Sequence, residues 1–260
     1  MRESIFLGFI QGLTEFLPIS SSGHLVLLGR TLFSHNPSPS LVVFLHGGTL
    51  LAIIVYFYRD LAKLILSLYH WREPAYHNGR RFISFLVIAT LPVALVGYMG
   101  EKFFFSFYNL SPFLSLFFFL TGTLLFFSEK FPPRKIRHLF YRNSFIIGVA
   151  QVFALFPGIS RSGVTVATGL LMGVKRRESF RFSFFLAIPA IMGAMFKETL
   201  GGNIFWGSEE ITGFLVSFLT GFFALYLFHW VLAIRKLKIF SFYLWGVSLL
   251  SLYLFLNSFS

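Results

Sequence analysis

The chain contains no cysteine and carries little charge. Without cysteine, disulfide bonds and thiolate metal sites are excluded. Only 12% of the residues are charged, which is about half the share of a typical soluble domain. By contrast, 56% are hydrophobic and 20% are aromatic, and Phe alone occurs 38 times. This excess of apolar surface needs a lipid solvent, so the composition excludes an ordinary soluble domain and predicts an all-α polytopic membrane protein.

Six apolar stretches are long enough to cross a bilayer, because a spanning helix needs about 20 residues. They cover residues 41–58, 82–100, 111–128, 180–197, 211–233 and 240–257. The first residues lack the basic region, apolar core and small-residue cleavage site of a signal peptide, so we expect no removable leader there. The sequence therefore predicts a single membrane domain over residues 1–260 with six transmembrane helices.

Two further apolar regions, 4–33 and 144–174, are each interrupted by a polar sequence that breaks helices. The first break runs from Pro18 to Gly23, and the second runs from Pro157 to Gly163. Proline removes a backbone donor and glycine relaxes the helix, so the chain is expected to turn at both places. Each region is predicted to be a re-entrant helix–loop–helix element, which enters the membrane and leaves it on the same side.

The basic residues fall in alternate segments. Of the 22 Lys and Arg residues, 17 lie in 59–81, 130–142, 175–181 and 235–238, four lie in the intervening segments, and one lies in the second break. The positive-inside rule assigns the 17 to the cytoplasm and both termini to the outside, and this partition requires both interrupted regions to be re-entrant. The net charge of +12 is therefore a signal of topology and argues against a nucleic-acid partner.

An offset of 140 residues superimposes the two breaks. Six of the thirteen positions from 11 to 23 are then identical, and these are Gln11/Gln151, Phe16/Phe156, Ile19/Ile159, Ser20/Ser160, Ser22/Ser162 and Gly23/Gly163. Each half, 1–128 and 144–260, has one re-entrant element followed by three spans. Because three is odd, the second copy is predicted to be inverted. Such repeats place a site where their broken helices meet, which holds for a transporter as well as for an enzyme.

The polar residues of the two breaks point to a phosphate site. Glu15 is the only one of the ten acidic residues that is expected inside a membrane-embedded element, with Gln11 on the same helical face. Ionisable groups in a bilayer are costly and mark function by default, whereas helix packing by small residues leaves Arg161 unexplained. A guanidinium matches phosphate oxygens, and Glu15 and His24 can move protons. Further donors are the hydroxyls of Ser20, Ser21, Ser22, Ser160, Ser162 and Thr165.

The same residues carry a family resemblance. The segment 11–24, Gln-Gly-Leu-Thr-Glu-Phe-Leu-Pro-Ile-Ser-Ser-Ser-Gly-His, resembles the first signature of the undecaprenyl-diphosphatase (BacA) family of bacterial membranes. The segment 157–165, Pro-Gly-Ile-Ser-Arg-Ser-Gly-Val-Thr, is similar to the second signature. Segments 88–97 and 171–174 are also similar, so the resemblance covers essentially the whole chain.

The resemblance implies hydrolysis of undecaprenyl diphosphate to undecaprenyl phosphate and inorganic phosphate at an outward-facing site of the cytoplasmic membrane. This reaction recycles the carrier lipid for peptidoglycan synthesis and gives bacitracin resistance. The implied catalytic residues are Glu15, Ser21, His24 and Arg161, and the implied substrate contacts are Gln11, Ser20, Ser22, Ser160, Ser162 and Thr165. A divalent cation, Mg²⁺ or Ca²⁺, is implied as a helper. We expect it to bridge Glu15 and the substrate, because no dedicated protein cage is evident.

Several alternatives stay open at the level of sequence. The attacking group is, in order of preference, Ser21 activated by His24, His24 itself, or a water activated by Glu15. Position 11 is Gln, where the family has Glu or Gln, so Glu15 acts alone among the acids. The rival function is a carrier or flippase for a polyprenyl phosphate lipid. In that case Arg161 would hold a phosphate without chemistry, and Glu15 and His24 would couple protons.

Overall fold

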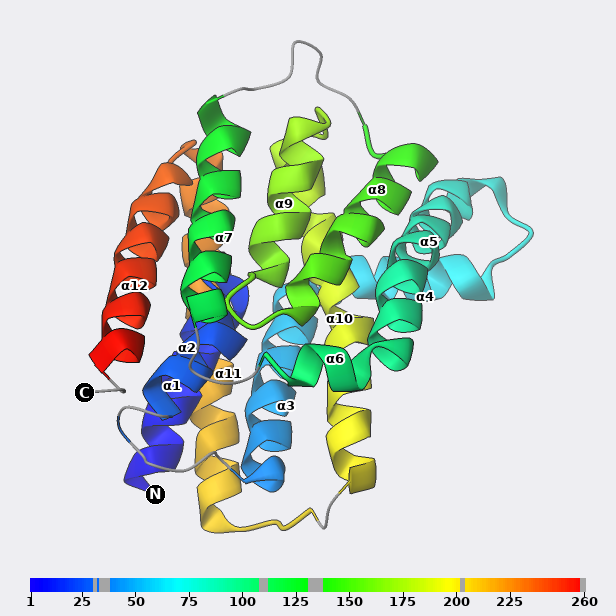
Figure 1. Cartoon of the computed structure of the whole chain (residues 1–260). Coiled ribbons are helices and arrows are strands. Elements are labelled where there is room, and N and C mark those ends of the chain that lie inside the picture. The colour runs from blue at the N-terminus through cyan, green and yellow to red at the C-terminus, as the bar shows by residue number, and fades with distance from the viewer. Residues whose placement is uncertain (30–31, 33–37, 108–111, 131–137, 202–203, 258–260) are drawn as a thin grey trace.

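The computed structural model describes residues 1–29, 32, 38–107, 112–130, 138–201 and 204–257 (Figure 1). In this part of the chain the longer helices are α1 (Arg2–Phe16), α2 (Ser21–Leu28), α3 (Pro39–Tyr56), α4 (Tyr58–Tyr69), α5 (His77–Met99), α6 (Glu101–Phe105), α7 (Pro112–Lys130), α8 (Tyr141–Val152), α9 (Arg161–Leu171), α10 (Arg176–Gly201), α11 (Ser208–Ala233) and α12 (Lys238–Asn257). Short 3-10 helices cover Pro74–Tyr76 and Phe153–Leu155. Some predicted positions lie outside the described residues, namely 30, 31, 33, 111 and the loop cations Arg134, Lys135 and Arg137.

Six of these helices are long and apolar enough to cross a membrane, namely α3, α5, α7, α10, α11 and α12. They confirm the all-α fold class and the six predicted spans. The spans that begin furthest ahead of their predicted starts are α5, at His77, and α10, at Arg176. Their first turns are basic, and a helix can continue past the apolar core of the bilayer into the zone where Lys and Arg are favoured.

The predicted basic segment 59–81 is not a plain loop, because α4 occupies its first half. The chain turns at Phe57, and α4 then packs against α5. Leu64 and Ser67 are buried on this side, while Ile65 and Tyr69 are exposed. An amphipathic helix of this kind, with basic and apolar residues together, is typical of a membrane surface.

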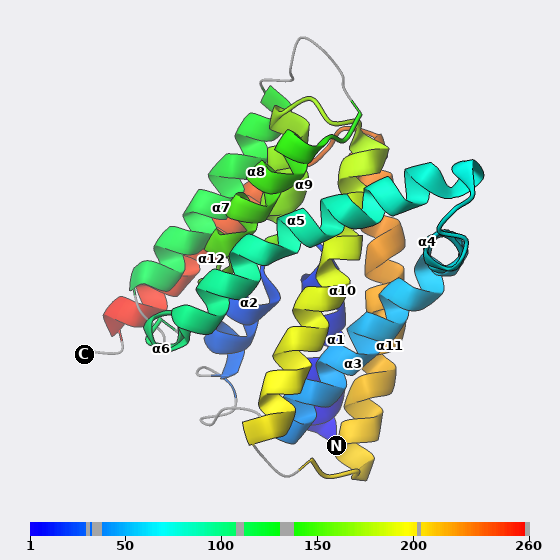
Figure 2. The ribbon, with the colours of Figure 1, turned by 90° about the vertical axis from the view of Figure 1, so that its right-hand side faces the viewer.

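The helices pack in pairs that join distant parts of the sequence. α1 packs along α11, α11 along α3, α8 along α5, and α12 along α7. Figure 2 shows α5 crossing in front of α10, which it also contacts. A Cβ atom on Gly12 would lie 2.0 Å from Oγ1 of Thr220, and one on Gly148 would lie 2.4 Å from the carbonyl oxygen of Ala89. Glycine at these positions therefore lets the backbones of paired helices approach closely.

A hydrophobic core rich in phenylalanine runs between the spans. Phe16, Phe118, Phe184 and Phe228 are fully buried in it. The rings of Phe16 and Phe184 meet edge to face at 5.5 Å, which is a favourable aromatic geometry. Because Phe16 is the last residue of α1, this core fixes the position of the turn that follows it.

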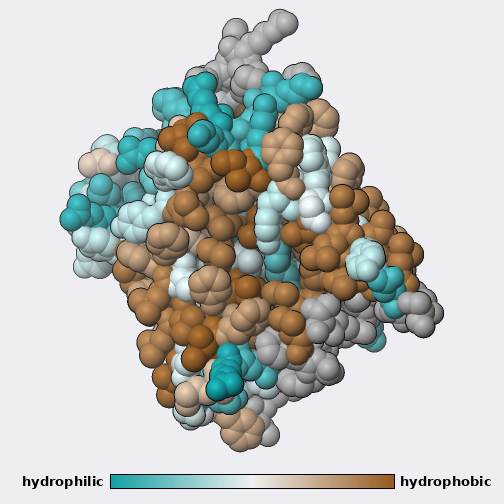
Figure 3. Space-filling model, turned by 90° about the vertical axis from the view of Figure 1, so that its left-hand side faces the viewer, coloured by the Kyte–Doolittle hydropathy of each residue, from teal (hydrophilic) through white to brown (hydrophobic). Residues whose placement is uncertain are grey.

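The surface has the distribution expected in a bilayer. Figure 3 shows one face of the molecule, with hydrophobic side chains across its middle and hydrophilic side chains gathered toward its upper end. Strongly exposed apolar side chains on the spans include Leu91, Leu219 and Leu249. Water would penalise so large a contiguous apolar surface, whereas lipid does not. The chain is therefore a multi-pass membrane protein.

Candidate active site

Two pairs of helices, α1–α2 and α8–α9, carry the predicted breaks, and both breaks end in the same cap. Ser20 is the N-cap of α2, and its Oγ accepts a hydrogen bond from the Gly23 amide at 3.3 Å. Ser160 is the N-cap of α9, and its Oγ accepts from the Gly163 amide at 3.1 Å. A serine N-cap satisfies an amide that the helix itself leaves unpaired. The matched Ser-x-x-Gly sequences therefore make the same cap hydrogen bond in both pairs, although Ser20 and Ser160 differ in backbone conformation.

The turns of the two pairs meet in the interior of the bundle (Figure 1). The amide of Gly158 donates to Ser20 Oγ at 3.1 Å, and Ser162 Oγ donates to the carbonyl oxygen of Leu17 at 3.3 Å. Ser20 has a φ of 72°, a conformation that residues other than glycine rarely adopt. Strain of this kind persists where the surroundings hold it and clusters at functional sites. Two segments far apart in the sequence therefore form one polar centre.

Glu15 lies at the middle of this centre and receives three donors. Arg161 Nη2 donates to its Oε1 at 2.7 Å, while Ser21 Oγ and Gln11 Nε2 donate to its Oε2 at 2.5 and 3.1 Å. The side chains of Glu15 and Arg161 are only 8% and 15% exposed. A buried charge is costly without a partner, so each of these two side chains compensates the charge of the other. The ion pair also links α1 to α9.

The other terminal nitrogen of Arg161 is available. Nη1 is buried and has no hydrogen-bond partner among the described residues. Buried donors in folded proteins nearly always have an acceptor, so an unpaired one needs an explanation. An anionic oxygen from a ligand would supply the acceptor, and a guanidinium is well suited to bind one through its second nitrogen.

His24 belongs to a neighbouring set of contacts. Its Nδ1 lies 2.8 Å from the carbonyl oxygen of Ser20, and its Nε2 lies 2.8 Å from the hydroxyl of Tyr243 on α12. A carbonyl oxygen only accepts, so Nδ1 donates, and Nε2 of a neutral imidazole then accepts from Tyr243. Ser21 bonds to Glu15, so the pairing of Ser21 with His24 that we preferred from the sequence is not the arrangement seen here.

The remaining predicted hydroxyls bond within the protein. Ser22 Oγ lies 3.4 Å from Ser20 Oγ, and Ser160 Oγ lies 3.1 Å from Ser162 Oγ. Thr165 Oγ1 donates to the Arg161 carbonyl oxygen at 2.8 Å and lies 2.6 Å from Ser183 Oγ on α10. Thr165 therefore joins α9 to α10, while the serines support the two turns around Glu15 and Arg161.

Two residues near the centre were not among the predicted site residues. Tyr243 contacts His24, and Thr121 Oγ1 donates to the Gly158 carbonyl oxygen at 3.1 Å. A tyrosine or threonine inside an apolar span gives no signal above its neighbours. Only the tertiary packing brings these residues to the site.

The implied divalent cation can be compared with the donors present. The described residues hold no group of three or more His, Asp or Glu side chains that could bind a metal ion. Both oxygens of Glu15 already accept hydrogen bonds from Arg161, Ser21 and Gln11. Mg²⁺ and Ca²⁺ need several oxygen ligands, so these residues do not fit a resident metal ion. A cation would be held only together with oxygens of the substrate.

The fold and the site define a polytopic helical membrane protein with a buried, ion-paired polar centre between two broken helix pairs. Within that class, the chain belongs to the family described as bacitracin resistance protein BacA, whose model matches residues 4–250.

Curated relatives are similar over almost their full length. A protein of Syntrophotalea carbinolica named undecaprenyl-diphosphatase is 41% identical over 254 residues, which are 94% of each chain. Proteins with the same name from Halothermothrix orenii and Korarchaeum cryptofilum are 36% and 38% identical, and cover 95% and 97% of this chain and 95% and 99% of their own lengths. The similarity therefore extends well beyond the two signature segments.

Proposed function

We propose that the protein hydrolyses undecaprenyl diphosphate to undecaprenyl phosphate and inorganic phosphate. Membership of the BacA family and relatives named undecaprenyl-diphosphatase support this activity. The observation that carries the proposal is the buried, unpaired Nη1 of Arg161 beside the hydrogen-bonded pair of Ser21 and Glu15. A donor that can bind a phosphate oxygen and a hydroxyl that can lose its proton to a carboxylate then lie next to each other.

The proposal includes a cellular setting. The protein acts in the bacterial cytoplasmic membrane, with its basic segments in the cytoplasm and its site open to the outer side. There it returns the spent carrier lipid to the monophosphate form that peptidoglycan synthesis uses, which also gives bacitracin resistance. The bilayer supplies the substrate, because the polyprenyl chain stays in the lipid.

Arg161 is the proposed anchor of the diphosphate. Its Nη1 bonds an oxygen of the terminal phosphoryl group while Nη2 keeps its bond to Glu15. The two turns are proposed to present backbone amides and hydroxyls to the substrate. The residues that shape these turns are Ser20, Ser22, Ser160 and Ser162, and Thr165 and Gln11 are proposed to help hold the substrate there. Phosphoryl transfer depends mainly on positioning and on stabilising charge, and a fixed guanidinium does both.

The proposed first step is an attack by Ser21. Its Oγ forms a bond to the terminal phosphorus, its proton passes to Glu15, and the bond from that phosphorus to the bridging oxygen breaks. Undecaprenyl phosphate leaves with the bridging oxygen, and the phosphoryl group stays on Ser21. The 2.5 Å bond from Ser21 to Glu15 supports this assignment, because a carboxylate that accepts from a hydroxyl is placed to take its proton.

The second step returns the enzyme to its starting state. A water attacks the phosphorus on Ser21, the bond to Oγ breaks, and inorganic phosphate leaves. Glu15 gives back to Ser21 Oγ the proton that it took in the first step, and both protons of the water leave with the inorganic phosphate. His24 is proposed to hold the turn that carries Ser21 in place during both steps, because its Nδ1 donates to the Ser20 carbonyl oxygen and its Nε2 accepts from Tyr243.

The test is phosphate release from undecaprenyl diphosphate by the purified protein in detergent, where transport across a membrane has no meaning. Wild type should release phosphate. Ser21→Ala removes the attacking oxygen, and Glu15→Gln removes the proton acceptor while keeping the shape of the side chain. We expect each to lose activity by at least about a hundredfold, the lower range for removing an acid–base group. Arg161→Lys keeps the charge and should also lose activity, because an ammonium group cannot replace a planar guanidinium that binds Glu15 through one nitrogen and the phosphate through the other.

A control separates chemistry from folding. Ser84→Ala removes a half-buried serine hydroxyl from α5, far from Glu15 in the sequence, and should leave turnover unchanged. Substrate binding without phosphate release by the wild type would contradict the proposal and favour the carrier. Full activity in Ser21→Ala would remove Ser21 as the attacking group and leave a water activated by Glu15.

A further inference from the structure

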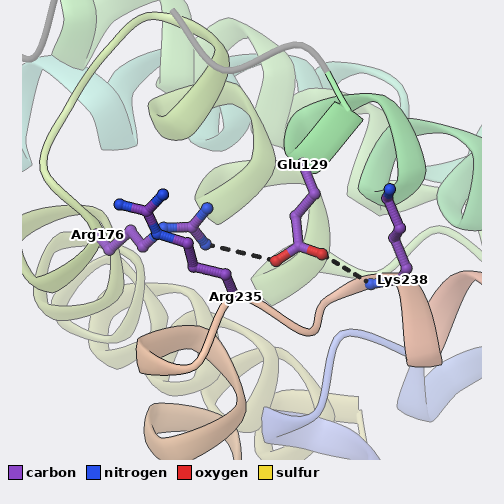
Figure 4. A pocket seen from close by; sticks show the side chains of 4 residues that line it. All are labelled: Glu129, Arg176, Arg235 and Lys238. Carbon is purple, nitrogen blue, oxygen red and sulfur yellow. Dashed lines mark hydrogen bonds and ion pairs between the residues drawn. The ribbon is translucent and has the colours of Figure 1, made fainter.

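A charged cavity lies where α7 ends, α10 begins and α11 turns into α12 (Figure 4). Its volume is about 140 Å³, and Glu129, Arg176, Arg235 and Lys238 line it. None of these residues belongs to the proposed active site, and all four lie in the segments with most of the basic residues or beside them. The cavity therefore needs an explanation of its own.

The lining carries three cations and one carboxylate. Arg176 Nη1 forms an ion pair with Glu129 Oε1 at 3.5 Å, and the backbone amide of Lys238 donates to Glu129 Oε2 at 3.2 Å. Glu129 is 5% exposed, so these contacts fix its carboxylate in the wall. Figure 4 shows the guanidinium groups of Arg176 and Arg235 on the same side of this carboxylate, and like charges so placed repel each other. Among the described residues the lining therefore carries a net charge of +2, and Lys238 Nζ also lies 5.2 Å from the centre of the Phe126 ring.

Arg235 occupies a backbone position that favours glycine. Its φ is 58°, and it follows α11 in the left-handed conformation that ends many helices. The Arg235 amide donates to the Leu232 carbonyl oxygen at 3.3 Å, and the Lys236 amide donates to that of Val231 at 3.1 Å, which is the usual bond pattern of such a helix end. An arginine here is strained where glycine would not be, so its side chain is kept at a cost to the fold.

The position and size of the cavity indicate what it can bind. A volume of about 140 Å³ holds several water molecules, and hence one phosphate group. Ile234 and Ile239, on either side of the basic residues of this turn, are 38% and 55% exposed. Basic pockets flanked by apolar surface at the end of a membrane bundle are suited to phosphate-bearing headgroups.

We propose that this pocket binds a phosphate group at the membrane surface. Arg235 and Arg176 present their guanidinium groups to the phosphate oxygens, Glu129 keeps Arg176 in place, and Lys238 adds positive charge on the other side of Glu129. A phosphate would offset the repulsion between the two arginines. The ligand is either the phosphate of an anionic lipid or free inorganic phosphate.

The experiment compares lipid retention by wild type and by Arg235→Gly. The full-length protein is purified in detergent and loaded with phosphatidylglycerol or with phosphatidylcholine, and bound lipid is counted by native mass spectrometry. We expect wild type to retain phosphatidylglycerol selectively, and Arg235→Gly to bind it roughly fivefold more weakly, as expected for the loss of one cation near an anionic lipid. Adding Lys238→Gln should bring the total to roughly thirtyfold.

Two further measurements make the result decisive. Arg235→Gly should unfold at the same temperature as wild type or higher, because glycine removes the strain, so weaker binding cannot be a failure to fold. Lys63→Gln, an exposed cation on α4, is the charge-matched control and should retain phosphatidylglycerol like wild type. Stabilisation of wild type, but not of Arg235→Gly, by inorganic phosphate alone would identify free phosphate as the ligand. Equal retention of both lipids, or equal weakening in Lys63→Gln, would overturn the proposal.

Discussion

Tyr243 shows at the scale of the residue how the site depends on contacts that the sequence hides. Its hydroxyl reaches Nε2 of His24 at 2.8 Å, and its ring is stacked on the imidazole, with planes 7° apart. The ring of Phe118 packs in a T-shaped arrangement with the same imidazole, and the two ring centres are 5.3 Å apart. The orientation of His24 is therefore set by two aromatic residues from α12 and α7 and by one backbone carbonyl oxygen.

The first prediction concerns this hydroxyl. Tyr243→Phe keeps the stacked ring and removes only the hydrogen bond to His24. We expect kcat for phosphate release to fall roughly three- to tenfold, the range for losing one hydrogen bond, with KM little changed. Steady-state kinetics on undecaprenyl diphosphate would measure both. Tyr253→Phe, at an exposed position of the same helix, is the control and should behave as wild type. An equal loss in both variants would show that the hydroxyl of Tyr243 has no special role.

At the scale of the element, we propose that the two halves of the chain are inverted repeats, each with a re-entrant pair. The contacts support it. His138, before α8, and Lys175, after α9, have side-chain nitrogens 2.9 Å apart, so the α8–α9 pair begins and ends on the same side. Under the offset of 140 residues α1 corresponds to α8, α3 to α10 and α5 to α11. The contact of α1 with α11 therefore has its equivalent in the contact of α8 with α5, and the contact of α3 with α11 has its equivalent in that of α10 with α5.

A glycine in each half supports the same symmetry and gives a second prediction. Gly8 and Gly148 are equivalent under the offset of 140 residues. A Cβ on Gly8 would lie 2.8 Å from the Gly213 carbonyl oxygen, and one on Gly148 would lie 2.4 Å from that of Ala89. Backbone cannot move aside as a flexible side chain can. Gly8→Val and Gly148→Val should therefore each destabilise the protein by about 1–3 kcal/mol, the usual range for overpacking.

Thermal unfolding in detergent would measure this loss. Gly246→Val is the matched control, because a Cβ on Gly246 has nothing within 4 Å and faces open space among the described residues. It should unfold close to wild type. If Gly246→Val were as harmful as the other two variants, a general cost of valine in these helices would explain the result, and close packing would not.

The elements also show what could be predicted from the sequence. The spans follow from apolar length alone, and both breaks follow from Pro and Gly with polar neighbours, as the caps at Ser20 and Ser160 illustrate. The pattern could not give α4, because its basic residues made the segment resemble a loop. It also could not give the partner of Ser21. Glu15 and His24 are both close to Ser21 in the sequence. The conformation of the turn at Ser20 places the Ser21 hydroxyl against the Glu15 carboxylate, and the sequence pattern does not reveal that conformation.

At the scale of the whole molecule, the charge distribution predicts an orientation. The hydrophilic side chains gather at one end (Figure 3), where α7 ends and α10 begins. The connection between α10 and α11, with Trp206 exposed, lies at the other end. Under the proposed function the basic end faces the cytoplasm and the substrate reaches the site from the outer leaflet, where a spent carrier lipid would have to be dephosphorylated.

The third prediction tests this orientation. The chain has no cysteine, so an introduced cysteine is its only thiol and the only position that a maleimide can label. Single cysteines are introduced by Arg72→Cys, His138→Cys, Lys175→Cys and Trp206→Cys, and whole cells are treated with a membrane-impermeant maleimide. Trp206→Cys should react in intact cells, whereas the other three should react only after the membrane is opened. Labelling of His138→Cys and Lys175→Cys from opposite sides would contradict a re-entrant α8–α9 pair. Labelling of Arg72→Cys in intact cells, with Trp206→Cys protected, would reverse the orientation and place the site on the cytoplasmic side.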